Sequence, residues 1–176
     1  MTSRAAFLAA LAFAGLLAAC GSKTPPGACP SGLIPTDASK ITRFRDGTGR
    51  DLTDVIVEGN VQDILVQCKY SKKEVVVDLQ IAITADRGPA DRSRVAEFPY
   101  FVAVQNPDGE ISTKEQFKVR FDFTDNRTHL GVVLNEAEPH IPLADVAKAD
   151  AYRIIVGFQL TPDELAWNRS QNSKQP

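Results

Sequence analysis

Three cysteine side chains supply the most reactive chemistry in this sequence, at Cys20, Cys29 and Cys68. A thiol can be acylated, can pair with a second thiol in a disulfide, or can coordinate a metal ion. The sequence around each cysteine decides among these fates. Cys20 directly follows a run of apolar residues, whereas Cys29 and Cys68 come later, where no CxxC redox motif is present.

Cys20 ends a short hydrophobic segment that has a basic start. Arg4 precedes an unbroken apolar run from Ala5 to Ala19. As a helix this run would be about 22 Å long, too short for a hydrocarbon layer of roughly 30 Å. Its length and flank are typical of a signal peptide. Alternatives are an ordinary cleaved signal with an incidental cysteine, or a buried apolar helix.

The letters LAAC at the end of the run resemble the lipobox of bacterial lipoproteins. This resemblance implies that residues 1–19 are a lipoprotein signal peptide and that Cys20 carries the lipid. Acyl chains then anchor the chain, each buried CH₂ adding about 0.8 kcal/mol. Gly21 follows the cysteine, and similarity to enteric sorting rules favours the outer membrane. We expect no cofactor besides the covalent lipid on Cys20.

Residues 21–28 are small, polar and rich in Pro and Gly, so residues 20–30 are predicted to be a lipidated tether. Nine residue steps from Cys20 to Cys29 span at most about 30 Å. The folded part is therefore expected to face the periplasm close to the bilayer. Because that compartment is oxidising, Cys29 and Cys68 are expected to form a disulfide. A metal pair or two free thiols are the alternatives.

A ligand-binding patch is the second candidate site. It would combine the arginines of a charged loop with aromatic side chains, namely Arg87, Arg92, Phe98, Tyr100, Phe101 and Trp167. Guanidinium groups bind phosphate or carboxylate groups, and aromatic rings supply contact area. Packing of the aromatic residues in the core, with a solvated charged loop, is the alternative interpretation.

No catalytic or metal-binding motif is recognisable. The sequence contains no GxSxG, no HExxH, no EF-hand loop and no glycine-rich phosphate loop. His129 and His140 are interpreted as exposed loop residues. Solvated turns and loops also account best for Asp122, Asp125, Asn126, Glu136 and Glu138. We therefore expect a protein that is not an enzyme and has no metal site.

Composition limits the elements that position these residues. The 176-residue chain is 43% hydrophobic, 24% charged and 7% aromatic, with a formal net charge of -2. Such a composition excludes collagen-like, wholly disordered and multi-span membrane classes, and it gives no electrostatic footprint for nucleic acid. One domain is expected at this length.

Hydrophobic residues alternate with polar ones through most of the chain, which predicts short strands joined by turns. The strands are expected at 40–44, 61–70, 74–84, 98–105, 111–113, 117–123, 130–134 and 152–160. A helix should start at Thr161-Pro162 and end near Arg169. The prediction is an all-β antiparallel sandwich over residues 31–170, immunoglobulin-like or fibronectin-III-like with about seven strands, and a disordered tail at 171–176. An OB-fold or lipocalin barrel is the competing architecture.

Several segments together resemble a group of alphaproteobacterial lipoproteins with no assigned activity. They are the lipobox, Cys29-Pro30, residues 49–54 (GRDLTD), residues 98–101 (FPYF), residues 141–143 (IPL) and residues 152–168. The resemblance covers nearly the whole mature chain and implies an envelope location, with no functional residues to carry over. The expected function is an accessory or scaffold that binds another envelope protein. A module that binds a small ligand, lipid or glycan is the alternative, and a cell-wall enzyme is a weaker one.

Overall fold

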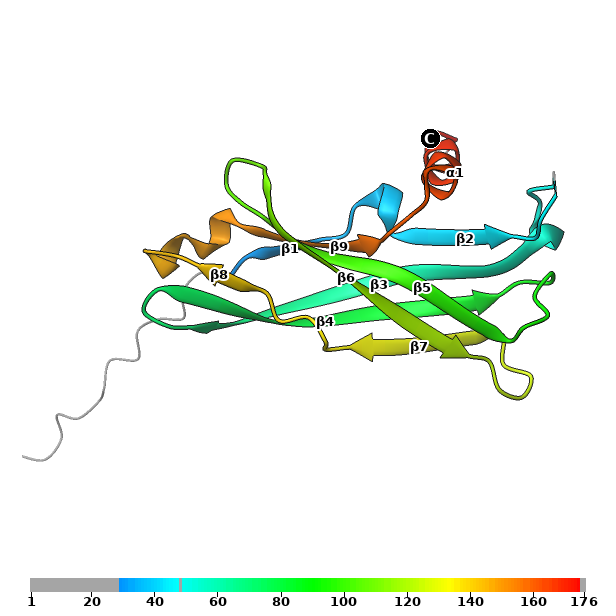
Figure 1. Ribbon diagram of the computed structural model, residues 1–176, viewed down its shortest axis with the longest axis horizontal. Helices are drawn as coiled ribbons and strands as arrows, with labels where there is room; N and C mark the ends of the chain where they lie inside the picture. The colour runs from blue at the N-terminus through cyan, green and yellow to red at the C-terminus, as the bar shows by residue number, and fades with distance from the viewer. Residues whose placement is uncertain (1–28, 48, 175–176) are drawn as a thin grey trace, which may run out of the picture.

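The computed structural model describes residues 29–47 and 49–174, so the predicted signal peptide, Cys20 and most of the predicted tether lie outside the described residues. Two packed β-sheets make up the domain (Figure 1). The strands within the described ranges are β1 (Ser31–Leu33), β2 (Lys40–Phe44), β3 (Val55–Tyr70), β4 (Glu74–Arg87), β5 (Val95–Gln105), β6 (Ile111–Asp122), β7 (His129–Leu134), β8 (His140–Pro142) and β9 (Arg153–Phe158). Short 3-10 helices η1 (Thr36–Ala38), η2 (Leu52–Asp54) and η3 (Val146–Ala151) and one α-helix, α1 (Pro162–Asn172), complete the fold.

One sheet has the order β1-β9-β5-β6, and the other has the order β2-β3-β4-β7, with β8 also paired to β4. All pairings are antiparallel except that of β1 with β9. The predicted all-β sandwich with a short C-terminal helix is confirmed. The described strands number nine rather than about seven, and two of them, β1 and β8, have only three residues each. From the sequence, residues 139–142 are expected to be extended and at an edge, which agrees with β8, whereas β1 has too few residues for an alternating pattern to reveal. In the immunoglobulin arrangement the last two strands are neighbours, whereas here β9 lies between β1 and β5.

Strand β4 shows how the alternating sequence builds the core. Its inward side chains, Val75, Val77, Leu79, Ile81 and Ile83, are all between 0 and 2% exposed. Successive side chains in a strand point to opposite faces of the sheet. The alternation predicted for this strand is therefore confirmed, and the intervening polar residues face outward or lie half-buried.

Strand β3 changes its inward phase halfway along. Val57, Gly59 and Val61 face the core, but beyond a register shift between Val61 and Asp63 the half-buried positions become Ile64 and the even-numbered residues after it. An extra residue in one strand of a ladder produces this change. The bulge lets one long strand pack first on the aromatic centre of the sandwich and then under β1. There a Cβ on Gly32 would come within 2.6 Å of Ile64.

The centre of the sandwich is aromatic. The ring centroids of Phe98 and Phe158 are 5.5 Å apart, and the two rings meet edge to face. Tyr100 stacks on Phe117, with 5.3 Å between the ring centroids. A Cβ on Gly59 would come within 2.9 Å of the Phe98 ring, so only glycine lets the two sheets approach this closely here. Burial, together with the nearby Glu136 carboxylate, raises the pKa of Tyr100 to about 12.

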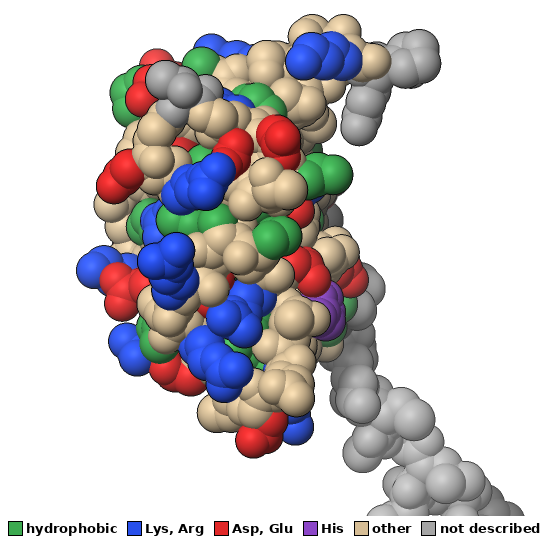
Figure 2. Space-filling view, turned by 90° about the vertical axis from the view of Figure 1, so that its right-hand side faces the viewer, with side chains coloured by type: hydrophobic (Ala, Val, Ile, Leu, Met, Phe, Trp, Pro, Cys, Tyr) green, Lys and Arg blue, Asp and Glu red, His purple; other side chains and the backbone are tan. Residues whose placement is uncertain are grey.

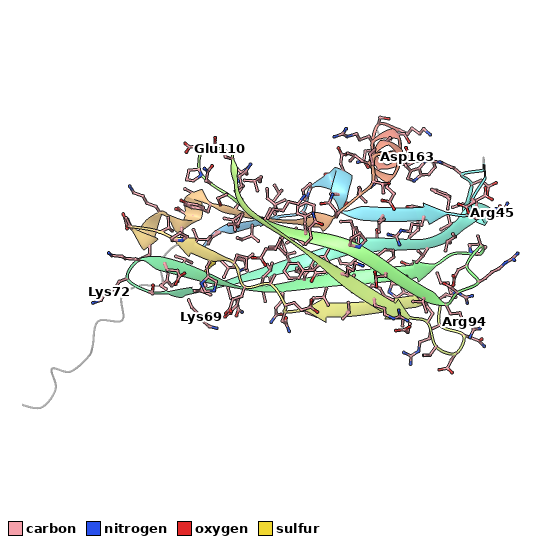
Figure 3. All side chains as sticks on the ribbon, in the orientation of Figure 1. Arg45, Lys69, Lys72, Arg94, Glu110 and Asp163 are labelled. Atoms are coloured by element: carbon pink, nitrogen blue, oxygen red, sulfur yellow. A yellow bond between two sulfur atoms is a disulfide. The ribbon has the colours of Figure 1, made fainter. Side chains whose placement is uncertain are left out.

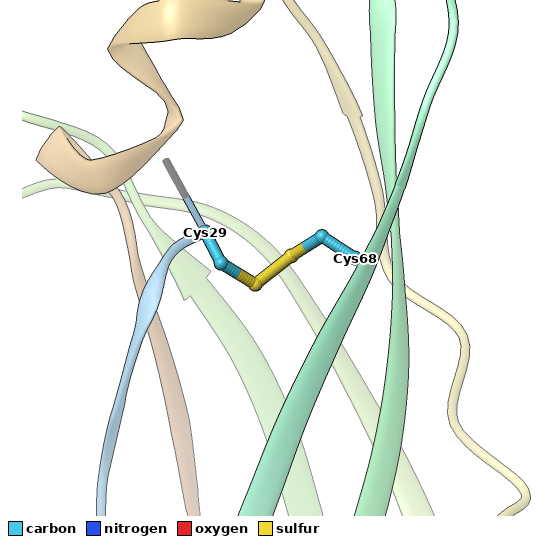
Figure 4. The surroundings of a disulfide bond; sticks show 2 residues. All are labelled: Cys29 and Cys68. Atoms are coloured by element: carbon cyan, nitrogen blue, oxygen red, sulfur yellow. A yellow bond between two sulfur atoms is a disulfide. The ribbon is translucent and has the colours of Figure 1, made fainter. Parts of the chain in front are cut away.

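The predicted disulfide is present between Cys29 and Cys68, with their Cα atoms 5.9 Å apart (Figure 4). It joins the residue just before β1 to the part of β3 that approaches the β3–β4 turn. This turn lies at the opposite end of the long axis from Arg45 and Arg94, as the labelled Lys69 and Lys72 show (Figure 3). The start of the described chain is thus fixed at one end of the sandwich, which we call the tether end. The end that carries Arg45 and Arg94 is the distal end.

Helix α1 begins at the predicted position, with a capping box. The Thr161 hydroxyl accepts a hydrogen bond from the Glu164 amide, and the Glu164 carboxylate accepts one from the Thr161 amide. The helix continues to Asn172, beyond the expected end near Arg169 and into the segment predicted as a disordered tail. Asp37 explains the extension, because its carboxylate accepts hydrogen bonds from both Arg169 and Asn172. These contacts join residues more than 130 positions apart, so no local pattern could predict them.

Candidate functional site

The structure separates the aromatic residues of the predicted ligand patch. Phe98 and Tyr100 point into the core and are 0% exposed, which agrees with the core-packing alternative. Phe101 lies on the opposite face of β5, because neighbouring side chains in a strand alternate. There it is half-buried, and the Lys114 ammonium lies 4.3 Å from its ring centre. Trp167 lies apart from all three, on α1.

One arginine of the predicted patch, Arg87, is already paired within the protein. The Arg87 guanidinium donates to the Asp91 carboxylate and is ion-paired with it. The same carboxylate accepts hydrogen bonds from the Ser93 amide, the Ser93 hydroxyl and the Arg94 amide. Burial acts to raise the pKa of Asp91, but these hydrogen bonds together outweigh it and hold the pKa below its usual value. Arg87 therefore braces the loop that follows β4 and is not available to a ligand.

Three hollows adjoin one another at the distal end. One, of about 400 Å³, and another, of about 610 Å³, share Thr42, Phe44, Arg50 and Trp167. A third, of about 490 Å³, shares Arg45 and Ile56 with the first and Thr53 with the second. All three surround residues 45–47 and 49–53, which belong to the connection between β2 and β3. Figure 2, which looks at this end, shows Lys and Arg side chains gathered around patches of apolar surface.

The two hollows that share Trp167 form what we call the aromatic groove, between β2 and α1. The Trp167 ring meets Phe44 edge to face at 4.9 Å. The Arg50 guanidinium lies over both rings, 5.8 Å from the Phe44 centre and 5.7 Å from the Trp167 centre. Leu52, on the wall of the larger hollow, is 84% exposed. An apolar side chain this exposed, beside two aromatic rings and an arginine, is typical of a binding surface.

Two acidic residues, the exposed Asp51 and the buried Asp54, fold the loop that carries Arg50 and Leu52. The Asp51 carboxylate accepts hydrogen bonds from the Thr53 amide and hydroxyl, which lower its pKa and start η2. Asp54 is buried, pairs with Arg45 at 2.5 Å and accepts a hydrogen bond from the Asp51 amide. The loop passes so close to this carboxylate that a Cβ on Gly49 would overlap it.

Arg43 fastens the aromatic groove to the rest of the sandwich. Its guanidinium donates to the Glu97 carbonyl oxygen at 2.8 Å and to the Glu164 carboxylate at 3.4 Å, and it lies 5.5 Å above the Phe98 ring centre. One side chain on β2 therefore contacts β5, α1 and the aromatic core. The groove is held by both sheets and by the helix.

A fourth hollow, of about 360 Å³, lies away from the distal end. Asp78, Glu136 and Glu138 line it together with amide side chains and two small apolar residues, Leu79 and Ala137. Within the described ranges, no group of three or more His, Cys, Asp or Glu side chains is placed to hold a metal ion. No described helix is both long enough and apolar enough to span a bilayer.

The two histidines lie on strands rather than in the loops expected from the sequence. His129 begins β7 and its Nδ1 lies 2.6 Å from the Asp86 carboxylate, while His140 begins β8 with its Nδ1 2.9 Å from Glu74. Both are exposed, as expected, and each joins neighbouring strands across a sheet. Neither lines any of the four hollows.

Phe44, Arg50 and Leu52 are the groove residues that sequence reasoning missed. The GRDLTD segment contained a usable signal, because Asp51 is a favoured N-cap residue and so predicts a helical turn at Leu52. Trp167 was singled out, but with partners that lie elsewhere. Compared with protein-family models, with curated proteins and with solved structures, this chain matches none of them.

Proposed function

We propose that this chain is a lipid-anchored lipoprotein of the bacterial envelope that binds another envelope protein through the aromatic groove. In this proposal the acyl chains on Cys20 hold it in the outer membrane and the sandwich faces the periplasm. The LAAC segment supports the anchor, and the likeness to alphaproteobacterial lipoproteins supports the location. The protein acts as an accessory or scaffold and not as an enzyme.

The arrangement of the two ends is compatible with this role. Thirteen residue steps of β3 separate Cys68 from Val55, which borders the groove, so the two lie about 40 Å apart. A tether that begins at the disulfide therefore leaves the groove far from the bilayer. A periplasmic partner could reach it without contacting the membrane.

The observation that carries the proposal is the position of Arg50 over Phe44 and Trp167, next to the exposed Leu52. Trp and Arg dominate the residues that contribute most to protein–protein affinity, and they do so when neighbouring side chains exclude water. The groove has both residue types, held in place by Arg43 and by the acidic residues of the loop.

Site-specific photo-crosslinking in the native host tests the proposal. A photoreactive residue in place of Leu52 should capture a defined protein, and one in place of Leu65, an exposed leucine on β3, should not. Capture from position 52 should fall at least tenfold when Trp167→Ala is added, since truncating a central aromatic residue costs about 2 kcal/mol or more. Equal capture from both positions, or capture that survives Trp167→Ala, would show that the groove is not the binding surface.

Binding of a small ligand or glycan is the second candidate function. The larger hollow, at about 610 Å³, has the size of a small-molecule site. Trp167 is the only tryptophan in the chain, so its fluorescence reports directly on the groove. A saturable change in that fluorescence with envelope glycan fragments, in the absence of any crosslinked protein, would favour this second function.

A further inference from the structure

The hollow next to the aromatic groove has a different chemistry. Arg45, Thr53, Ile56 and the loop residues 89–93 line its volume of about 490 Å³. Arginine and hydroxyl side chains thus face one another across it, from the β2–β3 connection on one side and from the β4–β5 loop on the other. We call it the arginine hollow. The hydroxyl groups of Thr53 and Ser93 already donate to Asp51 and Asp91, so the donors left for a ligand are guanidinium groups, which suit an oxygen-rich anion.

Arg92 is the cation in the arginine hollow that has no partner. It is exposed, and no ion pair, hydrogen bond or ring contact joins it to any residue in the described ranges. Arg45, by contrast, is paired with Asp54. The side chain of Arg92 therefore presents its full set of donors to whatever enters the hollow.

Asp91 also lines the hollow, but it does not compete for Arg92. Its carboxylate is already occupied by Arg87, by the amide and hydroxyl of Ser93 and by the amide of Arg94. The same hydrogen bonds fix the backbone of residues 91–94, so Arg92 extends from a braced loop. A donor held in advance loses less entropy when a ligand binds.

The charges indicate which anion fits. Two cations, Arg45 and Arg92, and one anion, Asp91, line the hollow. Arg45 is paired with Asp54, and Asp91 is paired with Arg87, which lies outside the lining. One positive charge is left over, which matches the single charge of a carboxylate. A phosphate monoester carries about -1.5 to -2 and would remain undercompensated.

We infer that the arginine hollow is a carboxylate-binding site in which Arg92 makes the ion pair. This inference goes beyond the proposed function, because the site would bind a carboxylate whether or not the groove binds a protein. If the groove does bind a protein, the adjoining hollow receives an acidic side chain of the same partner. The hollows share Thr53 and Arg45, so one partner can cover both.

Binding of acetyl-glutamyl amide to the purified chain in a nonionic detergent tests the site. The ligand is titrated at constant ionic strength while the amide resonances of Ser93 and Arg94 are followed by NMR. We expect saturable shifts with a Kd on the order of 1 mM, which is usual for a ligand of this size. The neutral isostere acetyl-glutaminyl amide should bind at least tenfold more weakly, and inorganic phosphate should bind more weakly than the carboxylate.

Two charge-matched variants locate the site. Arg92→Gln should weaken binding of acetyl-glutamyl amide about tenfold. Arg94→Gln removes the same charge two residues away, outside the lining of the hollow, and should change the Kd less than twofold. Both positions are exposed, so a preserved NMR spectrum is expected for each.

Three results would overturn the inference. They are the absence of saturation up to about 50 mM ligand, equal binding of the neutral isostere or tighter binding of phosphate, and equal weakening by the two variants. The crosslinking experiment depends on Leu52 and Trp167 rather than on Arg92, so the two proposals can fail separately.

Discussion

The two ends of the sandwich are closed by different interactions. At the tether end, β8 pairs with the start of β4, the Leu143 amide donates to the Lys73 carbonyl oxygen, and a disulfide joins Cys29 to β3. At the distal end, the connections after β2 and β4 are braced by the buried carboxylates of Asp54 and Asp91. One end is held by backbone ladders and a covalent bond. At the other end, buried carboxylates add to the backbone hydrogen bonds of the loops, such as that from the Ala90 amide to the Val55 carbonyl oxygen.

This difference explains where the candidate sites lie. Paired strands form hydrogen bonds between their backbone groups in a regular pattern. Such a regular surface has few side chains arranged around a hollow. A loop braced by one carboxylate can follow an irregular path, and the side chains between the braces, such as Arg50, Leu52 and Arg92, then turn outward. The three adjoining hollows with aromatic and arginine linings surround such loops, whereas the hollow nearer the tether end is lined by acidic and amide groups.

The largest effect is expected from the proposed anchor. Cys20→Ser removes the acylated thiol, so we expect the protein to move completely from the membrane to the soluble fraction, because nothing else in the proposal holds it there. Fractionation in detergent-free buffer measures this change. The double variant Cys29→Ser/Cys68→Ser should stay in the membrane fraction, and outer-membrane retention of Cys20→Ser would disprove the anchor.

Loss of the disulfide should be the largest effect on stability. The bond closes a loop with a sequence separation of 39 residues, which corresponds to about 4 kcal/mol of unfolding free energy in the chain-entropy model. Urea denaturation of oxidised protein and of Cys29→Ser/Cys68→Ser measures the difference. If the backbone hydrogen bonds between strands are what chiefly stabilise the tether end, the double variant will instead lose less than about 1 kcal/mol of unfolding free energy.

The distal end should respond most strongly to a change at Asp91. Asp91→Asn removes the negative charge that neutralises Arg87 and weakens the other hydrogen bonds to the loop, so the free energy of unfolding should fall by about 2–3 kcal/mol. Asp46→Asn, at an exposed carboxylate without a partner in the described residues, is the control and should change it by less than about 0.5 kcal/mol. Equal effects would mean that the buried carboxylate does not brace this end.

Alkaline pH should weaken the aromatic centre that both ends share. The pKa of Tyr100 is about 12 in the folded protein, against 10.0 for the unperturbed group. Its contribution is complete below pH 10 and is lost as pH rises toward 12, because only the unfolded chain releases the proton in that range. Two pKa units correspond to a loss of about 2.7 kcal/mol. Urea midpoints from pH 9 to 12 should therefore fall more steeply for the wild type than for Tyr100→Phe, and parallel curves would contradict this assignment.

The smallest effect concerns the helix that forms one wall of the groove. Thr161→Ala removes the N-cap and should cost about 1 kcal/mol. Trp167 emission should shift to longer wavelength as α1 loosens from Phe44, while Thr161→Ser, which keeps the hydroxyl, should leave both properties nearly unchanged. An unaltered emission spectrum in Thr161→Ala would show that Arg43 and Asp37 hold the helix without the cap.

Periodicity made much of the fold predictable. The inward side chains of β4, the bounds of β2, the capping box of α1 and the all-β class follow from local patterns, because alternation and capping act over two to four residues. The extension of α1 to Asn172 and the short strand β1 were not predictable. Each depends on partners far along the chain, such as Asp37 for the helix and β9 for β1.

The candidate sites divide in the same way. Residue types alone identified the cysteine pair, Trp167 and the arginine-rich loop, because thiols, indole rings and guanidinium groups have intrinsic chemistry wherever they lie. Only the tertiary structure decided that Phe98 and Tyr100 face inward, that Arg87 is neutralised while Arg92 is not, and that Arg50 lies over Trp167. Those outcomes depend on which strand face and which loop meet in space, and the contacts join residues separated by up to 117 positions between Arg50 and Trp167. The sequence by itself determined the strands and their chemistry, and long-range packing determined which groups remained free to bind.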